Sequence, residues 1–158
     1  MPRNRAVALV VHEDKLLVMH RKNSRDYYTF PGGGVEEGET NEQAAVREIY
    51  EETSIECEVG KLAYQLNYDN GDVHYYFFAK YIAGTPMVMP GTNEYKDNEL
   101  GFNLFLPEWA PIDELSNFTL YPLEVRDRFV LDSKNGFSEE VINFDLLVPE
   151  QYRKPKNS

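Results

Sequence analysis

Short apolar runs alternate with polar segments along the chain, a pattern typical of β-strands joined by turns. The β-branched run at residues 5–11 predicts a buried strand, and residues 15–20 predict the strand that returns beside it. Further strands are expected at residues 28–30, 55–68, 73–83, 104–112 and 141–148. The last of these could instead form a dimer contact. Apolar positions at helical spacing in residues 121–131 indicate an amphipathic helix.

The connections between these elements carry their own signals. Asn70-Gly71 predicts a β-hairpin with a tight type I′ turn, and Gly60 predicts a break in the strand before it. Residues 84–105 are rich in proline, glycine and asparagine, so we expect a long loop there. The strand at 73–83 has large side chains on both faces, which favours core packing on both.

One helix is unusually acidic. Thr40 and Gln43 have the spacing of a capping box, which predicts a helix that continues to Thr53. One face of this helix holds Val46, Ile49, Tyr50 and Thr53, and another holds Glu48, Glu51 and Glu52. Each like-charged pair at this spacing costs about 0.2–0.5 kcal/mol. An exposed acidic helix is one interpretation. The adjacent glycine-rich turn favours a site for a hard divalent cation such as Mg²⁺.

Composition narrows the class of protein. The chain has 158 residues, 42% of them hydrophobic, which is enough for one globular domain with a sizeable core. A net charge of −11 argues against broad nucleic-acid binding and against anionic membranes. The first residues lack a signal-peptide pattern, and Cys57 is the only cysteine, so no internal disulfide is expected. These features predict a cytoplasmic protein. If the protein forms an oligomer, a homodimer is expected, because dimers are the commonest oligomers.

The acidic helix belongs to a longer motif. Gly33 and Glu39 are followed by Arg47-Glu48-Ile49, Glu51-Glu52 and Ser54-Ile55 at fixed spacing. This pattern resembles the Nudix box of the Nudix (MutT-like) hydrolase family at eight of nine positions. The exception is Ser54, where the family has a glycine that ends the helix in a left-handed conformation. Serine there is expected to cost about 1–2 kcal/mol without loss of activity.

The resemblance implies a fold and an activity. It is strict over residues 31–55 and looser over residues 5–131. It implies an α+β fold, an α/β/α sandwich with a mixed central sheet flanked by helices, as one domain over residues 1–150. Residues 151–158 are expected to be a flexible tail. The implied reaction is Mg²⁺- or Mn²⁺-dependent cleavage of the pyrophosphate bond in a nucleoside diphosphate linked to another group. The alternative is a non-catalytic module that binds a nucleotide or a protein.

The resemblance also assigns roles to individual residues. The implied metal ligands are Gly32, through its backbone carbonyl, Glu48, Glu51, Glu52 and Glu94. Glu52, or a carboxylate from the later loop, would accept the proton of the attacking water. Arg47 would hold a glutamate in place and Glu39 would fix the loop, although both could be a purely structural bridge. Glu94 could equally be a solvated acid.

Substrate choice stays open at this point. Nucleoside triphosphates, including oxidised deoxynucleotides, ADP-ribose, nucleotide sugars and dinucleoside polyphosphates all fit the motif. Arg21 could meet a substrate phosphate, although a solvated cation is an alternative. Tyr76 and Phe78 could present their rings to a nucleobase, although core packing is an alternative. A nucleotide-type substrate is the expected class.

Overall fold

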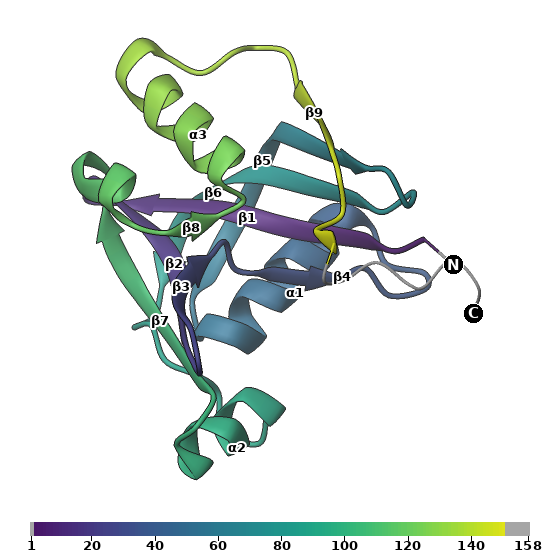
Figure 1. Cartoon of the computed structure of the whole chain (residues 1–158). Helices are drawn as coiled ribbons and strands as arrows, with labels where there is room; N and C mark the ends of the chain where they lie inside the picture. Colours follow the sequence, from purple (N-terminus) through teal and green to yellow (C-terminus); the bar gives the residue numbers. More distant parts are fainter. Residues whose placement is uncertain (1, 151–158) are drawn as a thin grey trace.

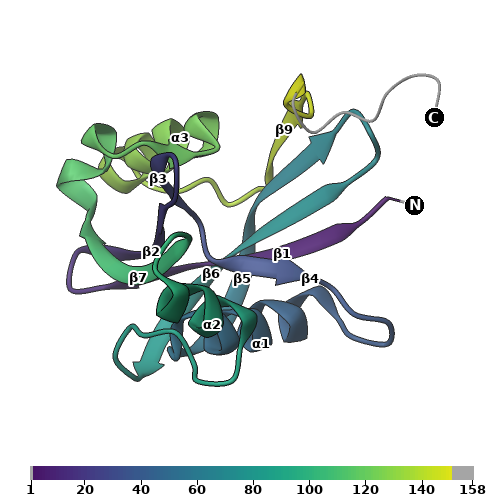
Figure 2. The ribbon, with the colours of Figure 1, turned by 60° about the horizontal axis from the view of Figure 1, so that its bottom comes forward.

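The computed structural model describes residues 2–150, and the predicted tail at 151–158 lies outside this range. A nine-stranded mixed sheet has helices on both of its faces (Figure 1, Figure 2). The strands are β1 (Asn4–His12), β2 (Lys15–Lys22), β3 (Asp26–Thr29), β4 (Gly32–Gly34), β5 (Glu56–Tyr68), β6 (Val73–Ala83), β7 (Leu104–Pro111), β8 (Leu120–Tyr121) and β9 (Ile142–Leu146). The helices are α1 (Asn41–Thr53), α2 (Asn93–Leu100), the 3-10 helix η1 (Ile112–Asn117) and α3 (Leu123–Asn135).

The strand order is β8-β3-β2-β1-β6-β5-β9, with β4 paired to β1 and β7 paired to β2. β1 and β6 are parallel, as are β5 and β9, whereas β1 and β2 form an antiparallel hairpin. The sheet is therefore mixed, and the predicted α+β class is confirmed. Within residues 2–150, no helix is long and apolar enough to cross a membrane.

Two hydrophobic cores lie on opposite faces of the sheet. Along β1, Val7 and Leu9 point into one core while Ala8 and Val10 point into the other, because side chains alternate along a strand. The first core includes Phe129 of α3, and the second is covered by α1. Figure 2 shows α3 and α1 on the two sides of the sheet. The prediction that both faces of β6 pack in a core is confirmed.

The structure corrects three details of the sequence prediction. The segment at 84–105 is not a continuous loop, because α2 forms within it between an N-cap at Thr92 and a left-handed C-cap at Gly101. The β5–β6 turn is not type I′, because only Gly71 in that turn has positive φ. The predicted apolar face of α1 is also shifted, since Val46 and Tyr50 are 38% and 42% exposed and the buried positions include Ala44 and Ala45.

Candidate active site

The glycine strand β4 and the helix α1 form the centre of the site. Gly32 and Gly33 pair with Val7 and Ala6 of β1, which places this strand directly against the sheet. The Glu48 carboxylate of α1 lies over Gly33 so closely that a Cβ atom there would collide with it. Oε2 of Glu52 accepts a hydrogen bond from the backbone N–H of Gly32 at 3.2 Å. Glu48 and Glu52, one turn apart, therefore both face the glycine strand.

Arg47 connects the acidic groups of the motif. Its Nε and Nη2 donate to the two carboxylate oxygens of Glu39 at 2.7 and 2.9 Å. Its Nη1 donates to Glu48 at 2.8 Å and to Glu51 at 3.2 Å, and Nη2 also donates to the backbone carbonyl of Gly34 at 2.9 Å. The Arg47 hydrogen bonds lower the pKa of Glu39 to about 2. One guanidinium thus offsets the repulsion among three carboxylates.

Glu52 has a strongly perturbed electrostatic environment. Its pKa is raised to about 8, first because burial disfavours the charged carboxylate and then because Glu48 repels a second negative charge. The Gly32 N–H and the charge of Arg5 oppose this rise, and the charge of Glu94 in the first turn of α2 adds to it. Burial likewise raises the pKa of Glu48, while Arg47 opposes that rise. Such perturbed carboxyl groups are typical of functional sites.

Arg5 is a residue of the site that sequence reasoning missed. Its Nη2 donates to the carbonyl oxygen of Gly32 at 3.1 Å, the same carbonyl that was expected to bind a metal. Its charge lowers the pKa values of both Glu48 and Glu52. An arginine at the start of a buried strand gives no local signal of this role, because the contact depends on the pairing of β1 with β4.

The donor chemistry fits a hard divalent cation. The groups that face the glycine strand are carboxylate and carbonyl oxygens, which Mg²⁺ and Mn²⁺ prefer. In residues 2–150, no three acidic, histidine or cysteine side chains converge into a ready-formed metal site. Arg47 holds Glu48 and Glu51 by hydrogen bonds, and the Glu51 side chain is 52% exposed. These two carboxylates are therefore engaged with Arg47 rather than gathered at one point.

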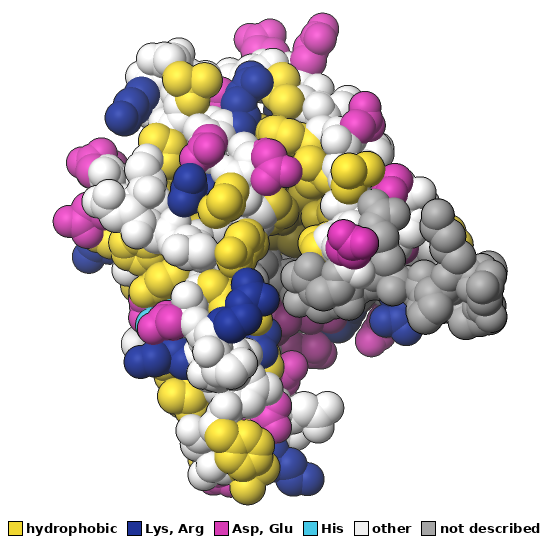
Figure 3. Space-filling model, in the orientation of Figure 1, with side chains coloured by type: hydrophobic (Ala, Val, Ile, Leu, Met, Phe, Trp, Pro, Cys, Tyr) yellow, Lys and Arg dark blue, Asp and Glu magenta, His cyan; other side chains and the backbone are white. Residues whose placement is uncertain are grey.

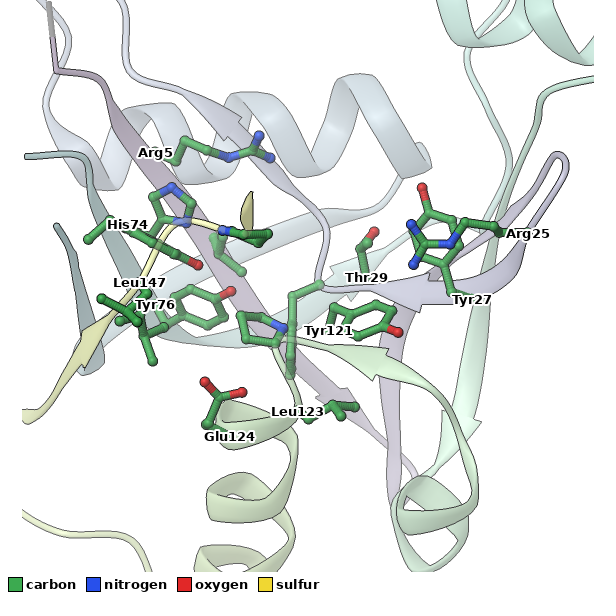
Figure 4. A pocket seen from close by; sticks show the side chains of 16 residues that line it. Arg5, Arg25, Tyr27, Thr29, His74, Tyr76, Tyr121, Leu123, Glu124 and Leu147 are labelled. Atoms are coloured by element: carbon green, nitrogen blue, oxygen red, sulfur yellow. The ribbon is translucent and has the colours of Figure 1, made fainter. Parts of the chain in front are cut away.

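A pocket of about 510 Å³ opens beside this site. Its aromatic and polar lining includes Arg5, Tyr27, Tyr68, His74, Tyr76 and Glu124 (Figure 4). Arg5 lies at the end of the pocket near α1, whereas Glu124 lies at the end formed by α3. In the space-filling view, hydrophobic side chains surround a hollow between α3 and β9, with acidic side chains below it (Figure 3). Arg5 therefore joins the pocket to the acidic groups.

Of the three predicted substrate contacts, one lines the pocket and two lie elsewhere. Tyr76 is 3% exposed and lines the pocket. Phe78 does not line this pocket, because its ring packs edge-on against Phe137 with centroids 4.8 Å apart. Arg21 also lies outside the lining, since its guanidinium stacks 3.7 Å from the centroid of the Phe105 ring and donates to Asn103.

Several lining residues had no sequence signal. Tyr121 comes from the edge strand β8, Tyr27 from its neighbour β3, and Glu124 from the first turn of α3. His74 shares the β6 face of Tyr76, and its pKa is lowered to about 4 by burial and by the charge of Arg5. These groups come together only through tertiary packing, which periodicity alone does not predict.

Comparison with known proteins identifies the same family as the sequence motif. The family model described as NUDIX domain matches residues 2–131. A putative 8-oxo-dGTP diphosphatase of Bacillus subtilis is 28% identical over 135 residues, which cover 83% of this chain and 79% of that protein. Diphosphoinositol polyphosphate phosphohydrolase 3-alpha of Mus musculus is 36% identical over 67 residues, so the match spans only 41% of its length and 41% of this chain.

Solved structures share the fold at low sequence identity. A NUDIX hydrolase from Nitrosomonas europaea has a TM-score of 0.70 at 18% identity, with 92% of this chain and 80% of that chain covered. An ADP-ribose pyrophosphatase from Streptococcus suis has a TM-score of 0.65 at 16% identity, with coverages of 91% and 100%. At this level of identity, the likeness establishes the architecture alone.

Proposed function

Because the chain belongs to the NUDIX family, whose model covers most of its length, we propose that it hydrolyses the pyrophosphate bond of a nucleotide-type substrate with Mg²⁺ or Mn²⁺. The observation that carries this proposal is the placement of Glu48 and Glu52 against Gly32-Gly33, with Arg5 shared between this site and an aromatic pocket. Its relatives include proteins named as pyrophosphatases of ADP-ribose and of oxidised dGTP.

The acidic groups would hold the ion. Glu48, Glu51 and Glu52 are the proposed ligands, with the Gly32 carbonyl and Glu94 as further oxygen donors. A bound Mg²⁺ or Mn²⁺ would lower the pKa of a coordinated water and offset the charge that develops on the phosphate oxygens. Arg5 would give up the Gly32 carbonyl and remain available for a substrate phosphate, since its guanidinium is always charged.

The remaining side chains position the reaction. Glu52 lies against the glycine strand and would accept the proton of the attacking water. Arg47 keeps Glu48 oriented toward Gly33 through its bond to Oε1, and Glu39 keeps Arg47 in place by two bonds. The aromatic pocket would orient the rest of the nucleotide. Positioning of the reacting groups, together with stabilisation of the developing charge, accounts for most of the catalysis of phosphoryl transfer.

The test compares the wild-type chain with Glu52→Gln on a panel of nucleoside triphosphates, ADP-ribose and nucleotide sugars. We expect turnover with Mg²⁺ or Mn²⁺, none with a chelator, and a loss of about 10²–10⁴-fold in kcat for Glu52→Gln. Glu42→Gln is the matched control, because Glu42 is an exposed residue of the same helix. Tight nucleotide binding without turnover in any of these proteins would instead identify a non-catalytic binding module.

A further inference from the structure

The segment at residues 142–149 lies beyond the part of the chain that the family model matches. Its strand β9 pairs in parallel with the second half of β5, from Tyr64 to Tyr68. The end of the segment is fastened to the β5–β6 hairpin, because Leu146 O accepts from Asp69 N at 3.0 Å and Val148 N donates to Asp69 Oδ1 at 2.9 Å. These bonds fix the positions of the side chains between them.

This segment supplies one wall of the 510 Å³ pocket. Leu146, Leu147 and Pro149 line it, and Figure 4 shows Leu147 on the side of His74 and Tyr76, away from Tyr27. Leu147 is 74% exposed although it is large and apolar. An exposed leucine at the rim of an aromatic pocket gains stability when a flat apolar surface covers it.

Four polar residues of the pocket lining have side chains without a hydrogen-bond partner in residues 2–150. The Tyr76 hydroxyl makes no hydrogen bond to the described part of the chain, although the residue is only 3% exposed. Nor do the hydroxyl of Tyr68, the ring nitrogens of His74 or the carboxylate of Glu124 bond to any residue in the range 2–150. The polar atoms of these groups are not fully enclosed, because Nε of Arg21 is the one fully buried polar side-chain atom without a partner in residues 2–150. They line the pocket and are therefore available to the hydrogen-bonding atoms of a ligand. A carboxylate accepts hydrogen bonds, so Glu124 favours N–H or O–H donors.

The names of the relatives suggest two classes of substrate, nucleotides and diphosphoinositol polyphosphates. The charge of the pocket lining favours the nucleotides. Arg5 and Arg25 are its cations in the described chain, and Arg25 is directed over the Tyr27 ring, 5.0 Å from the centroid. Each phosphate group on a ring would add about −1.5 to −2 charges. Two arginines opposed by Glu124 cannot balance several such groups. A planar base with N–H edges fits the tyrosine side chains and the carboxylate instead.

We propose that residues 142–149 form a specificity element that shapes the pocket for a nucleobase and against the multiply phosphorylated ring of a diphosphoinositol polyphosphate. The inference rests on the proposed function, because the phosphates of such a nucleotide would extend past Arg5 toward Glu48 and Glu52. Leu147 would cover the base, while Tyr76 and Glu124 would bond to its polar edge.

The experiment measures binding by calorimetry in the presence of a chelator, so that no turnover is needed. The probes are adenosine and guanosine 5′-monophosphate, ribose 5-phosphate, which lacks a base, and inositol hexakisphosphate. We expect at least one nucleoside monophosphate to bind more tightly than the other two probes. Leu147→Ala should weaken that binding about tenfold and leave ribose 5-phosphate unchanged. Leu131→Ala, on an exposed leucine of α3 outside the pocket, should bind like the wild type.

Two results would overturn this inference. One is equal nucleotide affinity in Leu147→Ala and the wild type, and the other is tighter binding of inositol hexakisphosphate than of either nucleotide. Because the assay excludes metal, it separates this proposal from the proposed reaction. The protein could bind nucleotides in a way that depends on Leu147 and yet show no hydrolytic activity. That result would support the proposed role of the pocket and contradict the proposed reaction.

Discussion

The guanidinium of Arg47 donates two hydrogen bonds, of 2.7 and 2.9 Å, to the carboxylate of Glu39. This pair joins the loop before α1 to the acidic face of that helix. The same guanidinium reaches Glu48, which lies over Gly33. A helix with three neighbouring glutamates is thus stabilised by one forked cation, which also fixes where Glu48 points.

Replacing Arg47 by lysine should therefore impair catalysis more than folding. A lysine ammonium is a point charge and cannot bond both oxygens of Glu39 while it also reaches Glu48. We expect kcat/KM to fall about 10–100-fold in Arg47→Lys, with a melting temperature near that of the wild type. Steady-state kinetics and thermal unfolding measure the two effects, with Arg3→Lys on an exposed arginine as the control. Wild-type kcat/KM in Arg47→Lys would contradict the positioning role.

His74 should make stability depend on pH. Burial and the charge of Arg5 lower its pKa from 6.5 to about 4, while Asp72 opposes the shift, and the Tyr68 ring packs against it. The unfolded chain therefore binds a proton at His74 below about pH 6.5 that the folded chain does not bind until about pH 4. The stability associated with neutral His74 is complete above pH 6.5 and is lost as the pH falls toward 4.

Urea unfolding of the wild type and His74→Gln at pH 7, 5.5 and 4.5 tests this prediction. The free energy of unfolding should fall more steeply with acidification in the wild type than in the variant, because glutamine does not titrate. His12→Gln is the control, since His12 is a partly exposed histidine at the end of β1 and does not line the pocket. Parallel pH profiles for the wild type and His74→Gln would show that His74 titrates alike in both states.

Local signals in the sequence predicted the elements that depend on neighbouring residues. The capping box of Thr40 and Gln43 forms as predicted, and so does the left-handed backbone at Ser54, with φ of 65°. The helix α2 was missed because proline and glycine around it dominate the pattern, although Thr92 and Gly101 are cap residues. The pocket was only partly predicted, because Arg5 and Glu124 are brought to it by sheet pairing and by the docking of α3.

Ser54 illustrates how the structure changes the expected energetics. A left-handed serine costs about 1–2 kcal/mol relative to glycine, but its hydroxyl donates to the Met87 carbonyl at 2.7 Å. Such a bond contributes about 0.5–1.5 kcal/mol. Ser54→Gly should therefore change the free energy of unfolding by less than about 1 kcal/mol and leave activity intact. Ser54→Ala keeps the strain and loses the bond, so it should melt below both. A Ser54→Ala chain as stable as the wild type would contradict the role of the bond.

The three glycines of β4 should respond differently to alanine, because each faces different atoms. A Cβ at Gly32 would collide with the backbone of Ala6 and Val7, which cannot move without breaking the β1–β4 pairing. A Cβ at Gly33 would collide with the Glu48 carboxylate, which is the far end of a flexible side chain and not backbone. A Cβ at Gly34 would have nothing within 4 Å. An alanine at Gly32 thus tests backbone packing, and an alanine at Gly33 tests the placement of the Glu48 carboxylate. An alanine at Gly34 meets no neighbouring atom and serves as the reference.

We expect Gly32→Ala to unfold at a clearly lower temperature, whereas Gly33→Ala and Gly34→Ala keep melting temperatures near that of the wild type. Gly33→Ala should nevertheless lose about 10²-fold in kcat/KM, because a shift of about 1 Å in a reacting group has an effect of that size. Gly34→Ala is the matched control and should retain its activity. Full activity in Gly33→Ala would mean that the contact between Glu48 and the glycine strand has no part in the reaction. Equal losses in Gly33→Ala and Gly34→Ala would attribute the effect to the strand rather than to the carboxylate.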